Sequence, residues 1–208
     1  MSNLIERTLS HIKTKRQNIL NGEINCVPSP WGCFAEDFPG IQQGKYYLIS
    51  ASQKGGKTQI TSYLFIFHPI LYAYQHREQL SVKIFYYPLE ETQEKITLRF
   101  MSYLLYTLSD FKIQVSTEDL TSVREALDEE VINLLESKEY QDILNFFQEC
   151  VEFKESTNPT GCYKDLKKYA ESNGTVHKKK VSYTNKNTGE IIEQEVFDYY
   201  EPYNPKEY

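Results

Sequence analysis

The sequence predicts an α/β domain in which a mostly parallel sheet is flanked by helices, with an N-terminal helix and a C-terminal β-hairpin. Two short, apolar, β-rich runs, residues 46–49 and 82–87, are each followed by a segment with helical apolar periodicity. A third short run follows at residues 151–153. A helix between the first two strands makes a βαβ unit, so these strands are expected to be parallel and the crossover right-handed.

Composition limits the protein classes. The 208 residues suit one domain with a sizeable core, and a net charge of −6 gives no sign of nucleic-acid binding, although a local basic strip remains compatible with it. No apolar run is long enough to span a membrane, and the N-terminus has no signal-peptide pattern. The four cysteines lack metal-site spacing, which indicates reduced thiols in a cytoplasm. Lys, Asn and Tyr richness is typical of an AT-rich genome, such as that of a phage.

The chain is expected to divide into an N-terminal helix and linker at 1–24, a core at 25–175, and a hairpin with a polar tail at 176–208. The amphipathic helix over residues 3–20 packs either on the core or on a neighbouring subunit. The Pro- and Gly-rich segment 25–44 is expected to wrap the domain edge, with Trp31 and Phe34 as anchors.

A glycine loop, ASQKGGKT, lies between the first strand and its helix. Strand, glycine loop, Lys-Thr and helix are the layout of a phosphate-binding P-loop, and only Ala51 departs from the pattern G-x-x-x-x-G-K-[ST]. Glycine lets the backbone approach a ligand, and successive N–H groups then form a nest for phosphate oxygens. The expected binding residues are Ser52, Gln53, Lys54, Gly55, Gly56, Lys57 and Thr58. The alternative is a turn that binds no ligand.

The second strand is expected to end beside this loop, at Glu90 and Glu91. Ligands bind at the C-terminal edge of parallel strands, where a carboxylate can accept a proton from an attacking water. Glu90 and Lys57 are therefore the candidate catalytic residues. The alternative is that Glu90 and Glu91 only cap the helix that starts near residue 92, where negative charge is favourable. Arg99 either holds an adenosine or phosphate group or pairs with a surface acid.

The remaining elements offer few candidate catalytic or binding residues. Pro69 predicts a kink or a break near His68, a structural histidine, in the helix over residues 58–78. Residues 116–150 read as acidic helices capped by Ser116 or Thr117, and 162–171 as a further helix. Runs 176–183 and 191–197 predict a hairpin joined by the loop 185–189, and the tail after it is expected to be loosely held. Its basic cluster, residues 177–180, either contacts phosphate or keeps an edge strand soluble.

Three stretches together resemble the C-terminal ATPase domain of DnaB-type replicative DNA helicases, which has a RecA-like fold. They are GIQQGKYYLISASQKGGKT at 40–58, YPLEETQEKITLRFMS at 87–102 and VEFKESTNPTGCYKDLKKYA at 151–170. The resemblance places the family's catalytic glutamate on Glu90 and its helix arginine on Arg99, and the family's P-loop often begins with alanine, as at Ala51. The hairpin after Gly174 looks like a lineage-specific insertion.

The resemblance implies a motor domain that couples ATP hydrolysis to movement on DNA in a homo-oligomeric ring, with Thr58 holding Mg²⁺. The family's Walker B strand, DNA loops and trans-acting arginine have no counterpart before Tyr208, so either a fragment or a degenerate relative is expected, and the intact P-loop favours a fragment. Two alternatives remain: a nucleotide-binding or assembly module without hydrolysis, and a small-molecule P-loop kinase.

Overall fold

The computed structural model describes residues 4–155, 158–184 and 189–208. The chain falls into two units, Met1–Lys154 with Tyr208 and Glu155–Glu207, and each is described by itself. The division places the last helix with the hairpin rather than with the preceding elements.

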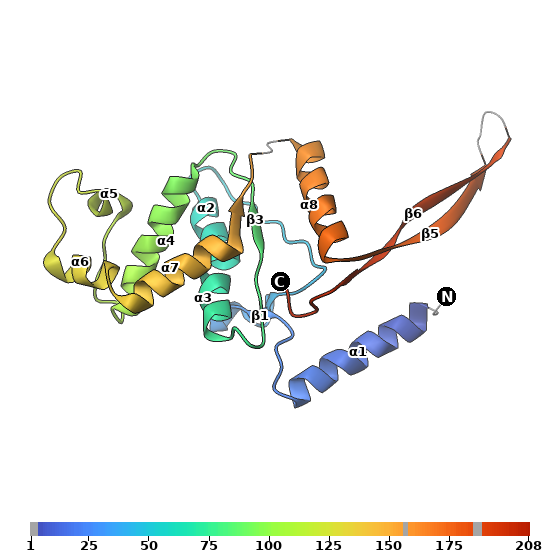
Figure 1. Ribbon diagram of the computed structural model, residues 1–208, viewed down its shortest axis with the longest axis horizontal. Coiled ribbons are helices and arrows are strands. Elements are labelled where there is room, and N and C mark those ends of the chain that lie inside the picture. The colour runs from blue at the N-terminus through green and yellow to red at the C-terminus, as the bar shows by residue number, and fades with distance from the viewer. Residues whose placement is uncertain (1–3, 156–157, 185–188) are drawn as a thin grey trace. The chain divides into compact units, whose positions relative to one another are not determined.

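Unit 1 is mainly helical, with short strands between its helices (Figure 1). Its elements are α1 (Leu4–Leu20), β1 (Val27–Pro28), the 3₁₀ turn η1 (Gly32–Phe34), β2 (Gly40–Ile41), α2 (Lys57–Ser62), the π-helical η2 (Tyr63–Phe67), α3 (His68–Gln75), β3 (Ile84–Tyr86), α4 (Gln93–Leu108), α5 (Thr117–Leu120), α6 (Glu129–Leu135), α7 (Lys138–Cys150) and β4 (Val151–Phe153).

Strands β3 and β4 form a parallel pair, in register from Ile84 opposite Val151 to Tyr86 opposite Phe153. The Lys154 amide extends the pair by donating to the Tyr86 carbonyl at 2.9 Å. The prediction of a mixed α/β chain with strands near 82–87 and 151–153 is therefore confirmed, although β3 is shorter than expected. The parallel pair joins β3 to β4, whereas the parallel partner expected for 82–87 was the run 46–49, and each sheet of the described residues has two strands.

The prediction of a buried strand at residues 46–49 is wrong. Tyr46 and Leu48 are 87% and 78% exposed, and residues 45–50 pair with no strand within the described part of the chain. Tyr47 and Ile49 are partly buried; the Tyr47 ring lies 5.8 Å from that of Phe65 and its hydroxyl donates to the Gly40 carbonyl at 3.1 Å. The run has strand propensity, but a strand also needs a neighbour to pair with, so the expected βαβ unit does not form.

An aromatic stack of Phe67, Phe100 and Phe147 forms the centre of unit 1. The Phe100 and Phe147 rings stack at 4.4 Å and 17°, and Phe67 lies 5.4 Å from Phe100. All three are buried, and each aromatic ring removes a large apolar area from water. Because they come from η2, α4 and α7, the stack holds these three helices together.

The helical run from Lys57 to Gln75 is interrupted where the sequence predicts. Residues Tyr63–Phe67 form a π-helical turn, and Pro69 follows near the start of α3. Proline lacks an N–H and clashes with the preceding turn, so the α-helical hydrogen-bond pattern changes there. The kink or break predicted near His68 takes the form of this π-helical turn, and the helical run continues through it to Gln75.

Helix starts follow local side-chain chemistry. Ser116 and Asp119 form a reciprocal capping box at α5, which confirms the predicted cap. At α4 the Thr92 hydroxyl accepts from the Lys95 amide, so neither Glu90 nor Glu91 is the capping residue.

The N-terminal segment keeps its predicted elements. α1 forms as an amphipathic helix, but none of its described residues is buried. β1 and β2 pair antiparallel, and Trp31 packs 5.5 Å from the Tyr63 ring and against Phe34, so the segment 25–44 is anchored as expected.

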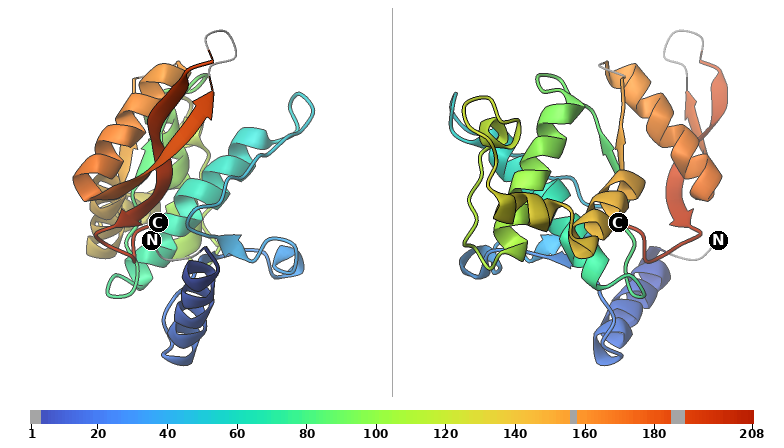
Figure 2. Two further views of the ribbon diagram at one scale, coloured as in Figure 1. Left: turned by 90° about the vertical axis from the view of Figure 1, so that its right-hand side faces the viewer. Right: turned by 60° about the vertical axis from the view of Figure 1, so that its left-hand side comes forward.

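Unit 2 consists of α8 (Pro159–Asn173) and a hairpin of β5 (Gly174–Thr184) and β6 (Ile191–Pro202), seen in Figure 2. The hairpin is confirmed and is longer than predicted; most of its expected loop lies outside the described residues. On it, Lys179 pairs with Asp198 at 3.2 Å and His177 with Glu201 at 2.9 Å.

The prediction of a loosely held tail is wrong. β6 continues to Pro202, and the Tyr203 amide donates to the Asn173 carbonyl at 2.9 Å. In unit 1, the Tyr208 amide donates to Ser81 and its carbonyl accepts from Lys83, both at 2.9 Å. The polar composition and the prolines predicted a conformationally flexible tail, but these backbone hydrogen bonds order it.

Among the described residues, no helix combines the length and apolarity needed to cross a bilayer. None of the four cysteines forms a disulfide, and burial raises the pKa of Cys150 to about 11.

His68 couples the stability of unit 1 to pH. Its Nε2 lies 2.9 Å from the Pro28 carbonyl, to which it donates, and burial lowers its pKa below the ordinary 6.5, partly offset by that hydrogen bond. Because the unfolded state then binds the proton more readily, we expect this contribution to be present above pH 6.5 and lost as pH falls below it. Urea unfolding between pH 7.5 and 5 measures the effect.

The His68→Gln variant keeps a donor but does not titrate, so it should lose less stability on acidification than the wild type. His11→Gln, on the exposed face of α1, is the matched control. Equal pH dependence of His68→Gln and the wild type would contradict the assignment.

Candidate phosphate-binding loop

The loop before α2 has the backbone conformation of an anion nest. Lys54 and Gly56 adopt left-handed conformations, with φ of 60° and 76°, on either side of Gly55. Such alternation turns successive N–H groups toward one side. Lysine rarely adopts this conformation, so its presence in the loop is a local strain of the kind that often accompanies binding sites.

The two glycines are needed for different reasons. Gly56 has a positive φ that glycine adopts without strain. At Gly55 a Cβ would lie 3.0 Å from the Ser52 carbonyl oxygen and 3.2 Å from the Ala51 Cβ. A side chain at residue 55 would therefore crowd the turn that the Gly55 amide closes by donating to the Ser52 carbonyl at 3.1 Å.

α2 begins at Lys57, directly after the loop, and no side chain caps it. The first described helical bond runs from the Ile60 amide to the Gly56 carbonyl at 3.0 Å. The helical run continues to Gln75, so the positive end of a long helix faces the loop. Thr58 lies in the first turn and is half-buried.

The Lys57 ammonium lies across the loop. Its Nζ donates to the Ala51 carbonyl at 3.1 Å and to the Ser52 carbonyl at 3.4 Å. These are weak bonds to an exposed amine, which phosphate oxygens could replace with stronger, charge-assisted ones. Loop and lysine together therefore fit a polyphosphate.

Arg99 forms a two-pronged ion pair with Glu91. Nη1 and Nη2 lie 2.5 and 2.6 Å from the two carboxylate oxygens, and the side chains are 29% and 19% exposed. Of the two roles left open for Arg99, pairing with an acid is the one observed. The sequence did not identify the acid, because eight residues and the start of a helix separate Glu91 from Arg99. One signal was available: a carboxylate stands just before a helix, and the second turn of that helix contains an arginine.

Glu90 is exposed in the bend after β3 and makes no hydrogen bond or ion pair with the described residues. Figure 2 shows the glycine loop and the segment 87–92 both in the upper part of unit 1, but the loop projects beyond the start of α2 and its tip lies well apart from that segment in both views. The structure thus brings together the residues from Ser52 to Thr58, whereas no described bond joins Glu90 or Arg99 to them.

Described residues include no group of three or more His, Cys, Asp or Glu side chains arranged to hold a metal. A magnesium ion on a nucleotide takes most of its ligands from phosphate and water, so the Thr58 hydroxyl is the relevant protein oxygen. Comparison of the chain with family models, curated proteins and solved structures returned no match.

A double-mutant cycle measures the ion pair. We expect Glu91→Gln and Arg99→Gln each to lower the free energy of unfolding, with a coupling energy of about 1 kcal/mol, because the pair is two-pronged and only partly exposed. Arg99→Lys should recover only part of it, since lysine cannot form the fork. Urea unfolding provides the values, and additive single mutations would contradict the pair's structural role.

Proposed function

We propose that this chain binds Mg²⁺-ATP at the glycine loop, as part of an ATP-hydrolysing motor domain of a DnaB-like DNA helicase with a RecA-like fold. The observation that carries the proposal is the left-handed backbone at Lys54 and Gly56, directly before an uncapped helix that begins at Lys57. This combination supports an anion site without any side chain other than Lys57.

Different residues of the loop would bind different groups of the ligand. Backbone N–H groups from Ser52 to Gly56, other than that of Gly55, which donates to Ser52, would cradle phosphate oxygens, with Gln53 and Lys54 at the outer edge. The Lys57 ammonium would leave its two carbonyls for the β- and γ-phosphates, where it neutralises charge. The Thr58 hydroxyl would hold Mg²⁺.

Glu90 is the proposed general base. Its side chain is exposed in the bend that follows the parallel strand β3, and ligands bind at this edge of open α/β sheets. A carboxylate without a described partner can accept a proton from water, whereas Glu91 is already paired with Arg99. Arg99 is accordingly proposed to hold Glu91 rather than the nucleotide.

A second candidate function is nucleotide binding or assembly without hydrolysis. None of the described strands of unit 1 ends in an aspartate, and residues 46–49 before the loop pair with no described strand and expose Tyr46 and Leu48. Hydrolysis needs a second group on Mg²⁺ and a closed site, whereas binding needs only the loop. The homo-oligomeric ring and its DNA contacts belong to the proposal for the motor; the exposed apolar face of α1 supports a protein partner.

Calorimetric titration with Mg²⁺-ATP tests the proposal. We expect saturable binding that Lys57→Ala weakens by about 10- to 100-fold, the effect of losing charged hydrogen bonds. Lys45→Ala, an exposed lysine just before the loop, should bind as the wild type does. Phosphate release that Glu90→Gln lowers by about 100-fold would favour hydrolysis over binding alone.

Binding that survives Lys57→Ala unchanged would overturn the phosphate site. Binding without any phosphate release would retain the site and replace the motor with the second candidate.

A further inference from the structure

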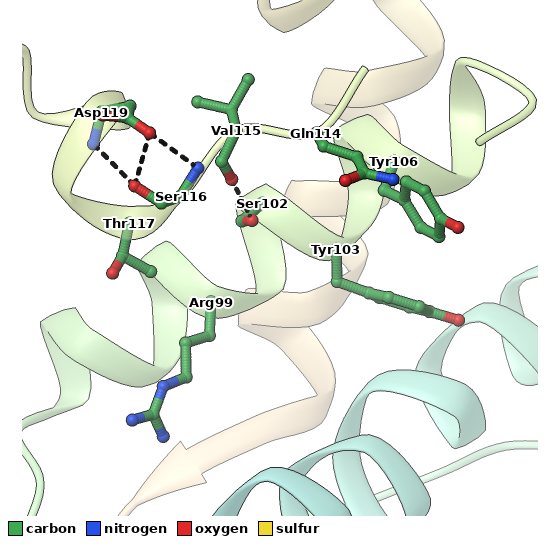
Figure 3. Close-up of a pocket in the computed structure, with 9 residues that line it drawn as sticks. All are labelled: Arg99, Ser102, Tyr103, Tyr106, Gln114, Val115, Ser116, Thr117 and Asp119. Carbon is green, nitrogen blue, oxygen red and sulfur yellow. Dashed lines mark hydrogen bonds between the residues drawn. The ribbon is translucent and has the colours of Figure 1, made fainter. Parts of the chain in front are cut away.

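A concavity lies on α4, apart from the glycine loop. It has a volume of about 550 Å³, within the range of about 300–1,000 Å³ for small-ligand sites. Arg99, Ser102, Tyr103 and Tyr106 come from one face of α4, since spacings of three, four and seven residues share a face. The segment 114–119 forms the other side (Figure 3).

The walls are aromatic and rigid. The ring of Tyr103 stacks on Phe67 at 5.6 Å and 20°, and edge-on to Tyr63 at 5.4 Å, which fixes its orientation. Burial, with Tyr63 beside it, raises the pKa of Tyr103 to about 12, so the ring stays uncharged. Tyr106 is held against Phe111 at 5.0 Å. Fixed, neutral aromatic walls favour a flat ligand.

Some polar groups of the concavity are already used. Ser102 donates to the Val115 carbonyl, and Asp119 accepts from the amide and hydroxyl of Ser116, the bonds drawn in Figure 3. By contrast, the Gln114 amide and the Tyr106 and Thr117 hydroxyls make no hydrogen bond within the part of the chain that the structure describes. Figure 3 shows the Gln114 amide beside Tyr106, whereas Thr117 lies at the other end of the concavity, near Ser116. Gln114 and Tyr106 therefore supply the donors and acceptors beside the aromatic walls.

Charge decides the class of ligand. Both terminal nitrogens of Arg99 are bound by Glu91, and Figure 3 shows its guanidinium directed away from Gln114. Asp119 adds a negative charge to the lining, so the concavity carries no excess positive charge. A phosphate would have to displace Glu91, whereas an uncharged planar group with a donor and an acceptor on one edge displaces nothing.

We propose that this concavity, defined by Tyr103, Tyr106, Gln114 and Thr117, binds a nucleobase, with adenine preferred. A glutamine amide donates and accepts in one plane, which matches the N6 and N7 positions of adenine, and tyrosine rings stack on bases. The base comes either from a free nucleoside or from a single strand. The proposal does not depend on the glycine loop.

Adenosine tests the site, because it carries no phosphate for the glycine loop. Titration followed by calorimetry should give saturable binding, weakened about tenfold or more by Gln114→Ala and by Tyr106→Leu, which keeps apolar bulk against Phe111. Inosine, which lacks the N6 amine, should bind more weakly. Gln148→Ala, an exposed amide on α7, and Lys57→Ala should leave adenosine binding unchanged.

An oligo(dA) strand separates the two sources. Tighter binding of the strand than of adenosine, with the same loss in Gln114→Ala, assigns the base to a strand, and equal affinity assigns it to a nucleoside. No saturable binding of either, or binding insensitive to both substitutions, overturns the proposal. Loss of Mg²⁺-ATP binding in Lys57→Ala is a separate result and does not bear on it.

Discussion

The stack of Phe67, Phe100 and Phe147 is the interaction on which the rest of unit 1 depends. It joins η2, α4 and α7, and through them it positions both candidate sites. The glycine loop precedes the helical run that contains Phe67, and the concavity lies on the helix that contains Phe100. Tightly packed aromatic rings resist displacement, so exposed segments with few buried contacts can still be held in defined places.

The glycine loop itself owes its shape to the backbone. Two left-handed residues and a position without room for a Cβ set the turn, and Lys57 folds over it. These features are set by the backbone of the loop itself, so the loop keeps its shape although it is exposed to solvent. The Glu91–Arg99 pair has a different role: it ties the exit of β3 to α4 and leaves the neighbouring Glu90 without a described partner.

Features with a local cause were predictable from the sequence: the start of α2 at Lys57, the Ser116 cap, the break before Pro69 and the hairpin. Their causes are glycine freedom, capping and proline sterics, which act over a few residues. Features set by distant partners were missed. The run at 46–49 has strand composition but no strand to pair with. Arg99 forms an ion pair with Glu91, an acid that sequence spacing did not identify. The tail is ordered by backbone hydrogen bonds to Asn173, Ser81 and Lys83.

The central claim is that the loop around Gly55 and Gly56 cradles phosphate. Inorganic pyrophosphate with Mg²⁺, which contains no base, addresses the loop alone. Titration followed by amide ¹⁵N–¹H NMR should shift the signals of Gly55, Gly56, Lys57 and Thr58 and leave those of Tyr103 and Tyr106 in place. Unchanged loop signals, or shifts concentrated on the lysines of β5, would contradict the claim.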